Sequence, residues 1–250
     1  MQGAALDVPL EITTVGDVPS GTGMGSSSTP TVGLLAALYG YRNRVVSSRL
    51  LVEQACQIEI DVLGKPIGRQ DQYAAGFGRL NYIRFNPDAT VDVEPVPSWP
   101  ETMAELERQT LLVYTGQTRD ANVILERQSS GATADRKDVL RSMRDLAHEM
   151  RDALGGDGDL DRFAALLHEG WARKRSLGCG ISNDQVNEWY GAARWAGALR
   201  GKLLGAGCCC FLLLVATTWR HRAIREALGR PHELPFRIAR HGSRLIFVHN

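Results

Sequence analysis

The chain has 250 residues, of which 44% are hydrophobic, so it can bury a core as one large domain or two small ones. Its 29 basic and 28 acidic residues nearly cancel, which gives no electrostatic reason to expect nucleic acid or an anionic membrane as partner. The start, MQGAALDVPL, lacks the basic and apolar regions of a secretory signal. The apolar run Leu203–Ala216 is shorter than the about 20 residues that span a bilayer. We therefore expect a cytoplasmic protein.

The cysteines do not indicate a disulfide framework, because their number is odd and three of them are adjacent. Neighbouring residues of a strand point to opposite faces, so a CCC run cannot close a tetrahedral zinc site by itself. Neither CxxC nor HxxxH accompanies the run. We expect reduced thiols at Cys56, Cys179, Cys208, Cys209 and Cys210.

The first hundred residues predict a strand, two helices and a hairpin. Residues 10–15, LEITTV, alternate apolar and polar side chains as a half-buried strand does. A helix is expected over 27–39, with Pro30 tolerated in its first turn. Ser47 can cap a second helix, whose apolar face we expect to consist of Leu51, Ala55, Ile58 and Val62. Residues 80–85 and 91–96 predict a hairpin around the turn sequence NPDAT.

The stretch VPSWPE is the best candidate for a boundary, which predicts domains over 1–100 and 101–250. Beyond it, TLLVYT is expected to form a strand, and FLLLVA a second one. Helices are predicted over 139–154, 159–176, 183–197 and 218–228, with Asn183 as a cap, and a final hairpin over 236–248. The mixed order of elements predicts an α+β fold and disfavours a doubly wound sheet.

The most unusual stretch is DVPSGTGMGSSSTP, residues 17–30, where three alternate glycines precede three serines and a predicted helix. A helix N-terminus presents unpaired amides and a partial positive charge, and glycines let a phosphate approach the backbone. The spacing matches neither GxxxxGK[ST] nor GxGxxG. A phosphate-binding loop and an ordinary helix-capping turn therefore both remain open.

Two carboxylates could complete a phosphoryl-transfer site. Asp71 lies in the glycine-flanked stretch IGRQDQYAAGFG, and Glu59 precedes it by 12 residues. One carboxylate could bind Mg²⁺ and the other could lie near an acceptor hydroxyl. The alternative is that both are solvated surface acids. A second glycine-rich segment, GKLLGAG at 201–207, could likewise be only a tight connection.

Together these segments resemble a known family, the GHMP small-molecule kinases. PSGTGMGSSS is similar to the family's second signature, GRQDQ to its catalytic-aspartate segment, and LGAGCCCF to its third, glycine-rich signature. The closer resemblance is to bacterial D-glycero-D-manno-heptose 7-phosphate kinases. It is carried by QIEIDVLGKPIGRQDQYAAGFGRLNYIRFNPD, by YTGQTRDAN, and by KRSLGCGISN through GALRGKLLGAG.

The resemblance implies a two-part α+β fold with the active site between the parts. The N-terminal part would be an incomplete ribosomal protein S5 domain 2-like subdomain, and the C-terminal part a ferredoxin-like one. The implied enzyme is a sugar kinase, a phosphotransferase with an alcohol group as acceptor. It would transfer phosphate from ATP to O1 of heptose 7-phosphate. Another anomeric sugar kinase of fucose or galactose type, or a non-catalytic remnant, are the alternatives.

The resemblance also assigns roles to individual residues. ATP would bind at Pro19, Gly21, Gly23, Met24, Gly25, Ser26, Ser27 and Ser28. Ser27 and Glu59 would hold Mg²⁺, and Asp71 would act on the sugar hydroxyl. The sugar phosphate would meet Gln72, Thr115, Gly116, Arg119, Gly205 and Gly207. The implied partners are a sugar phosphate and ATP, without nucleic acid or membrane, and a homodimer is left open.

The chain departs from the family pattern in two places. Only 18 residues precede Pro19, where family members carry a first signature, P-x-R-x-x-x-x-G-G-x-x-D. We therefore expect a truncated member that is poorly soluble and inactive, with an unpaired edge at residues 10–15. In the third signature, Cys208, Cys209 and Cys210 replace glycines. If one of those positions has positive φ, cysteine costs roughly 1 kcal/mol or more there.

Overall fold

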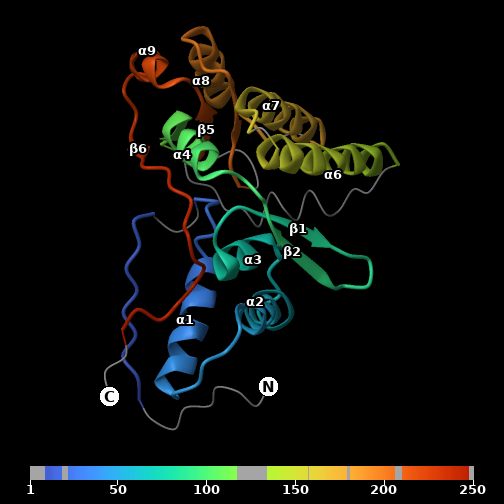
Figure 1. The fold of residues 1–250 in the computed structure, drawn as a ribbon, viewed down its shortest axis with the longest axis vertical. Helices are drawn as coiled ribbons and strands as arrows, with labels where there is room; N and C mark the ends of the chain where they lie inside the picture. Colours follow the sequence, from blue (N-terminus) through green and yellow to red (C-terminus); the bar gives the residue numbers. More distant parts are fainter. Residues whose placement is uncertain are drawn as a thin grey trace. The chain divides into compact units, whose positions relative to one another are not determined.

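A computed structural model describes residues 9–18, 22–116, 134–156, 158–178, 181–205 and 210–247. The chain divides into two compact units (Figure 1). Unit 1 consists of Met1–Arg79 together with Ala239–Asn250, and unit 2 of Leu80–Ile238. The expected domain boundary at residue 100 lies within unit 2, and the division at that residue stays a prediction.

Unit 1 is built around three α-helices and one π-helix. They are α1 (Ser28–Tyr41), α2 (Ser48–Cys56), η1 (Gln57–Val62) and α3 (Gln70–Phe77). The two predicted helices are confirmed, and Ser47 caps α2 as expected, because its side chain accepts a hydrogen bond from the Leu50 amide at 3.2 Å. Their core consists of Val32, Leu35, Ala36, Tyr39, Leu51 and Ala55.

The π-helix changes which side chains face inward after α2. Leu51 and Ala55 are buried as predicted, but Val62 is 55% exposed, and Glu59 has no exposed surface. A π-turn inserts an extra residue and so rotates the following side chains relative to an α-helical face. The predicted apolar face is therefore right for Leu51, Ala55 and the partly buried Ile58, which packs against the same core, and wrong for Val62.

The predicted strand at residues 10–15 is wrong. These residues form no strand, and Leu10, Ile12 and Val15 are 38%, 54% and 94% exposed. A strand needs a neighbour for its backbone amides and carbonyls, and the described residues of unit 1 contain no other strand.

The predicted hairpin at 236–248 is also wrong, because its described residues, 236–247, contain no strand. The chain instead returns to unit 1, where the Ser243 amide donates to the Ala75 carbonyl at 2.8 Å. A Cβ at Gly78, whose φ is +60°, would overlap the backbone of His241, and a Cβ at Gly242 would overlap that of Gly76. Glycines on both sides thus allow two backbones to touch.

Unit 2 begins with the predicted hairpin and a helix that the sequence analysis missed. Strands β1 (Asn81–Phe85) and β2 (Val91–Pro95) pair antiparallel, as expected. Helix α4 (Pro100–Gln109) starts with a proline at a position where its missing amide costs nothing. Its amphipathic pattern, with buried Leu106, was the signal available for it.

The rest of unit 2 is a four-stranded antiparallel sheet with helices packed against both faces. The strands are β3 (Thr110–Tyr114), β4 (Arg200–Leu203), β5 (Phe211–Val215) and β6 (Glu233–Leu234), in the order β4-β5-β3-β6. The helices are α6 (Ala134–Gly155), α7 (Leu160–Ser176), α8 (Asp184–Trp195) and α9 (His221–Ala227), with a 3₁₀ turn at Thr218–Arg220. Helices α6, α7 and α8 lie between β3 and β4, and α9 lies between β5 and β6, so the strand order and helical connections are those of a ferredoxin-like sheet with extra helices, and the α+β class is confirmed.

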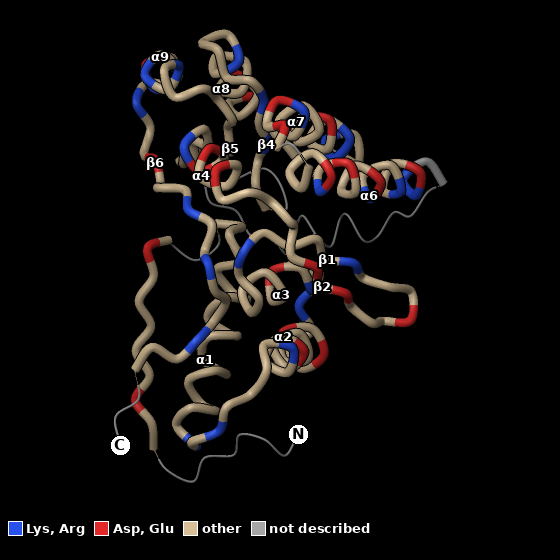
Figure 2. The backbone as a smooth tube through the Cα atoms, viewed as in Figure 1, with Lys and Arg blue, Asp and Glu red and all other residues tan. Residues whose placement is uncertain are grey.

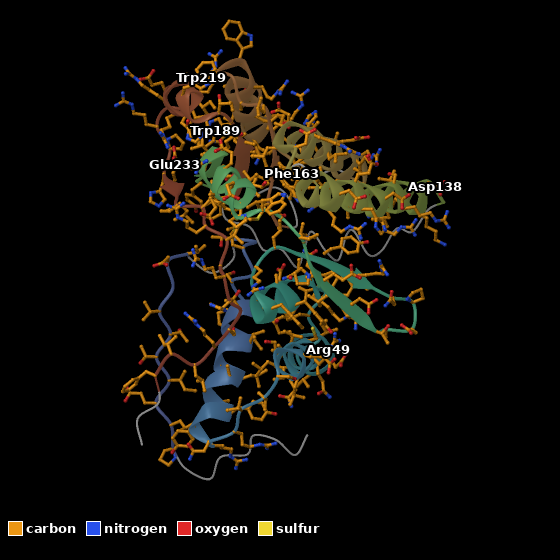
Figure 3. The ribbon with its side chains drawn as sticks, in the orientation of Figure 1. Arg49, Asp138, Phe163, Trp189, Trp219 and Glu233 are labelled. Atoms are coloured by element: carbon orange, nitrogen blue, oxygen red, sulfur yellow. The ribbon has the colours of Figure 1, made fainter. Side chains whose placement is uncertain are left out.

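Along β3 and β5, successive side chains point to opposite faces of the sheet. The core of unit 2 therefore has two parts, each packed against different helices. Leu111, Val113, Leu212 and Leu214 belong to a cluster with residues of α8 and α9. Val215 packs on the other side with residues of α7. The short strand β6 is held by Glu233, labelled in Figure 3, whose two carboxylate oxygens accept from Arg225 at 2.8 and 3.0 Å.

The helices of unit 2 carry mixed charges on their outer surfaces. Basic and acidic residues alternate along α6 and α7 (Figure 2), and pairs such as Arg141–Asp138, at 2.8 Å, lie on the exposed side. In the described ranges, no helix combines the length and apolar character that a membrane span requires.

Cys210 has a positive φ, the backbone conformation that is costly for a cysteine. Its φ is +89°, and its side chain is fully buried at the start of β5. The Cys210 amide donates to Thr115 Oγ1 at 3.1 Å, and the Thr115 amide donates to the Cys210 carbonyl at 2.8 Å, which fixes this conformation. Cys208 and Cys209 lie outside the described residues.

A comparison of alanine and glycine at two buried cysteines tests this strain. Both replacements remove the sulfur, so their difference isolates the backbone. At Cys210 we expect glycine to be more stable than alanine by about 1 kcal/mol, because φ is positive. At Cys56, in helix α2, alanine should be the more stable by about 1 kcal/mol. Urea unfolding measures both differences, and the same order at both positions would contradict the assignment.

Candidate active site

The glycine–serine loop leads directly into helix α1. Gly23 and Gly25 have φ values of +68° and +69°, so both positions need glycine. Ser27 is the N-cap residue of α1, but its side chain makes no hydrogen bond to the helix amides. Pro19 and Gly21 lie outside the described residues. The first turn of α1 thus presents amides that the Ser27 side chain does not cap.

The Ser27 side chain binds Glu59 instead of its own helix. Ser27 Oγ donates to Glu59 Oε1 at 2.5 Å. Lys65 Nζ donates to the same two atoms, at 2.5 Å to Ser27 Oγ and 3.1 Å to Glu59 Oε1. Gln72 Nε2 donates to the other carboxylate oxygen at 2.6 Å. The structure therefore gathers residues from the loop, η1 and α3 around one carboxylate.

Glu59 is held in its charged form. Burial by itself would raise the pKa of this carboxyl, but hydrogen bonds from Ser27, Ser28, Lys65 and Gln72 outweigh burial and lower it below the ordinary 4.5. A buried carboxylate is tolerated only when it is hydrogen-bonded and paired. The reading of Glu59 as a solvated surface acid is wrong, because the residue has no exposed surface.

Asp71 lies beside the loop in the first turn of α3. A Cβ added at Gly25 would be 3.7 Å from the Cβ of Asp71 and 3.3 Å from Thr29 Oγ1. Asp71 is partly buried. The structure therefore brings the serine loop, Glu59 and Asp71 together within unit 1, although 12 residues separate the two acids in the sequence.

Gln72 contributes an unusual feature to this cluster. Its side chain has no exposed surface, and while its amide nitrogen binds Glu59, its Oε1 has no hydrogen-bond partner among the described residues. An unsatisfied buried acceptor costs about 1–3 kcal/mol, so this oxygen favours a ligand that can satisfy it. The predicted contact of Gln72 with substrate stays a prediction.

The oxygen atoms of this cluster suit Mg²⁺. Ser27 Oγ, the Glu59 carboxylate and the orphaned Gln72 oxygen are hard donors, which this ion prefers. Across the described residues, no group of three or more His, Cys, Asp or Glu side chains could form a dedicated metal cage. Few protein ligands are the rule where Mg²⁺ is shared with substrate phosphates.

Of the residues predicted to contact the sugar phosphate in unit 2, those that the structure describes lie at one end of its sheet. Thr115 and Gly116 follow β3, and Gly205 follows β4. The Gly205 carbonyl accepts a hydrogen bond from Lys174 Nζ at 2.5 Å, a residue that the sequence analysis did not single out. Arg119 and Gly207 lie outside the described residues.

Lys65 of unit 1 was not predicted as a site residue either, because no local pattern marks a lysine that binds a serine 38 positions away.

The structure is an α+β protein with a glycine–serine loop at a helix start beside two acidic residues, an arrangement that can bind phosphate groups. Residues 2–79 match the GHMP kinases N terminal domain, and residues 142–232 match the GHMP kinases C terminal domain. The chain belongs to the GHMP kinase family.

Several of the similar proteins are sugar kinases. A D-glycero-alpha-D-manno-heptose 7-phosphate kinase from Campylobacter jejuni is 33% identical over 89% of this chain and 67% of its own. The crystal structure of a D-glycero-D-manno-heptose 1-phosphate kinase from Bacteroides thetaiotaomicron is 28% identical, with a TM-score of 0.73 over 94% of this chain and 66% of that one. A bifunctional fucokinase/GDP-fucose pyrophosphorylase from Arabidopsis thaliana is 26% identical over 83% of this chain and 20% of its own. The chain thus spans about two thirds of the two heptose phosphate kinases.

Replacing Glu59 by glutamine tests whether its charge stabilises unit 1. At pH 7 we expect Glu59→Gln to lower the free energy of unfolding by about 1–3 kcal/mol, because charge-assisted hydrogen bonds are lost. The folded pKa is lowered, so the stabilisation is complete above the ordinary pKa of 4.5 and is lost as the pH falls through the folded value.

The difference between wild type and variant should therefore shrink on acidification below about pH 4.5. Urea unfolding between pH 7 and about pH 3 measures it, with Glu188→Gln at an exposed position of α8 as the control. A difference that does not depend on pH would contradict the charged state.

Proposed function

We propose that the chain carries out ATP-dependent phosphorylation of a sugar phosphate, with D-glycero-D-manno-heptose 7-phosphate as acceptor at O1. The observation that supports it most is the buried carboxylate of Glu59 bound to Ser27 at the start of α1, with Asp71 beside Gly25. The two heptose phosphate kinases support a heptose phosphate, although their names place its phosphate at different positions, 7 and 1.

The loop is assigned to the phosphates of ATP. Backbone amides from Gly23 to Ser28 are the donors, and the α1 macrodipole favours negative charge at this end. Because φ is positive at Gly23 and Gly25, both positions favour glycine, and the absence of side chains there leaves this backbone accessible. Gly21 and Pro19 are assigned to the same function from the family motif.

Ser27 and Glu59 are assigned to Mg²⁺. The ion would neutralise charge on the phosphate oxygens during transfer. The protein contributes a carboxylate that hydrogen bonds already hold ionised and in a fixed orientation. Such preorganisation lowers the cost of binding the ion.

Asp71 is assigned to the acceptor hydroxyl, which it would orient or deprotonate. Its place in the first turn of α3, next to Gly25, puts it beside the loop assigned to ATP. Thr115, Gly116, Arg119, Gly205 and Gly207 remain proposed contacts of the sugar phosphate, together with Gln72. The fucokinase relative favours a fucose-type acceptor as the second candidate.

Removing the Asp71 carboxylate tests the catalytic assignment. We expect Asp71→Asn to lower kcat by about 10²- to 10⁴-fold, the usual contribution of a general base, with ATP affinity retained. ADP release with heptose 7-phosphate and with fucose measures turnover, and calorimetry measures ATP binding. Asp138→Asn, at an exposed position of α6, is the matched control. Equal turnover by wild type and Asp71→Asn removes the assignment, and no turnover by the wild type with either sugar favours a non-catalytic chain.

The same substitution at two glycines tests the phosphate loop. Gly23→Val places a side chain at φ +68°, where the amides are assigned to ATP, and should reduce ATP affinity by at least about tenfold. Gly33→Val lies within α1, where an added Cβ meets nothing within 4 Å, and should leave affinity unchanged. Titration calorimetry on both folded variants decides, and unchanged affinity in Gly23→Val would favour an ordinary capping turn.

A further inference from the structure

Lys65 has a contact that the proposed function does not use. Its ammonium lies 2.5 Å from Ser27 Oγ and 3.1 Å from Glu59 Oε1, the two side chains assigned to Mg²⁺. The backbone positions it there, because the Lys65 amide donates to the Glu59 carbonyl at 3.0 Å and Gly64, at φ +62°, turns the chain after η1. A cationic group of the protein thus contacts the oxygens that are assigned to a metal ion.

We propose that Lys65 is a built-in cation for this site, and that Mg²⁺ binds by displacing its ammonium from Ser27 and Glu59. The inference rests on the assignment of Mg²⁺ to these two side chains in the proposed function. An ammonium and a divalent ion on the same two oxygens would lie within a few ångströms of each other and repel strongly. One of them therefore has to leave when the other binds.

The structure provides for this exchange. Glu59 has no exposed side-chain surface, whereas the Lys65 side chain is 31% exposed. A lysine ammonium sits on a flexible four-carbon stem, so it can withdraw into solvent while its backbone stays in place. The buried ligand can therefore remain fixed while the partly exposed cation moves.

The exchange also explains how Glu59 can be buried and charged before a metal ion binds. Without a positive partner, a buried charge is strongly destabilising. Lys65 supplies that partner and, through Ser27 Oγ, keeps the serine hydroxyl on Glu59. Lys65 does not satisfy Gln72 Oε1, which has no hydrogen-bond partner among the described residues. This oxygen is therefore available to a metal ion, which takes more ligands than a lysine ammonium does.

A purely structural ion pair predicts the opposite effect of removing Lys65. If Lys65 only supports Glu59, its loss loosens the ligands and weakens metal binding or leaves it unchanged. If Lys65 competes with the metal, its loss strengthens metal binding. The sign of the change in metal affinity separates the two.

The test measures Mn²⁺ binding by electron paramagnetic resonance and Mg²⁺ binding by calorimetry, without nucleotide or sugar. We expect Lys65→Met, which keeps an unbranched side chain of similar length, to bind either ion at least about tenfold more tightly than wild type. Lys65→Arg retains the charge and should bind no more tightly than wild type. Lys137→Met, at an exposed position of α6, controls for the loss of one positive charge.

Thermal unfolding supplies a second readout. Without metal, Lys65→Met should melt at a lower temperature than wild type, and saturating Mn²⁺ should stabilise it by more degrees than it stabilises wild type. Equal or weaker metal binding by folded Lys65→Met overturns the proposal, and so does the absence of metal binding in both proteins. Sugar kinase activity is measured separately, so its failure is distinguishable from the failure of this exchange.

Discussion

A carboxylate without exposed surface remains charged only if hydrogen bonds and a positive partner replace the water that it has lost. Glu59 imposes this requirement on unit 1. The loop supplies Ser27, α3 supplies Gln72, and the turn after η1 supplies Lys65. Three segments that share no local sequence pattern are thereby held together at one side chain. The start of α1 and the first turn of α3, with Asp71, are positioned as a consequence.

The π-helix is what places Glu59 inside. A continuous α-helix through residues 48–62 would have kept Val62 on the face of Leu51, Ala55 and Ile58. The π-turn instead leaves Val62 more than half exposed and turns Glu59 inward. Such irregular turns weaken helix geometry and are often found at functional sites. Here the irregularity exposes an apolar side chain and buries a carboxylate.

The two units handle backbone strain differently at their glycine-rich segments. In unit 1, Gly23 and Gly25 occupy positive φ, so the loop adopts its conformation without a steric cost. In unit 2, Gly116 and Gly205 do the same, but Cys210 has positive φ with a buried side chain. Its hydrogen bonds with Thr115 hold β3 and β5 together at that point. Unit 2 thus retains its strand pairing in spite of a residue that strains the backbone.

Most elements whose hydrogen bonds are local could be predicted from the amino-acid pattern, although α4 was not. Helix periodicity and the caps Ser47 and Asn183 predicted α2 and α8, and turn residues predicted the β1–β2 hairpin. The motifs also predicted one site containing Ser27, Glu59 and Asp71, and the structure brings these residues together. Two outcomes became visible only in three dimensions: residues 10–15 form no strand, and residues 236–247 return to unit 1 without a hairpin. Strand pairing and burial depend on partners far along the chain, and no local pattern encodes such partners. The same holds for the contacts of Glu59 with Ser27 and of Ser27 with Lys65.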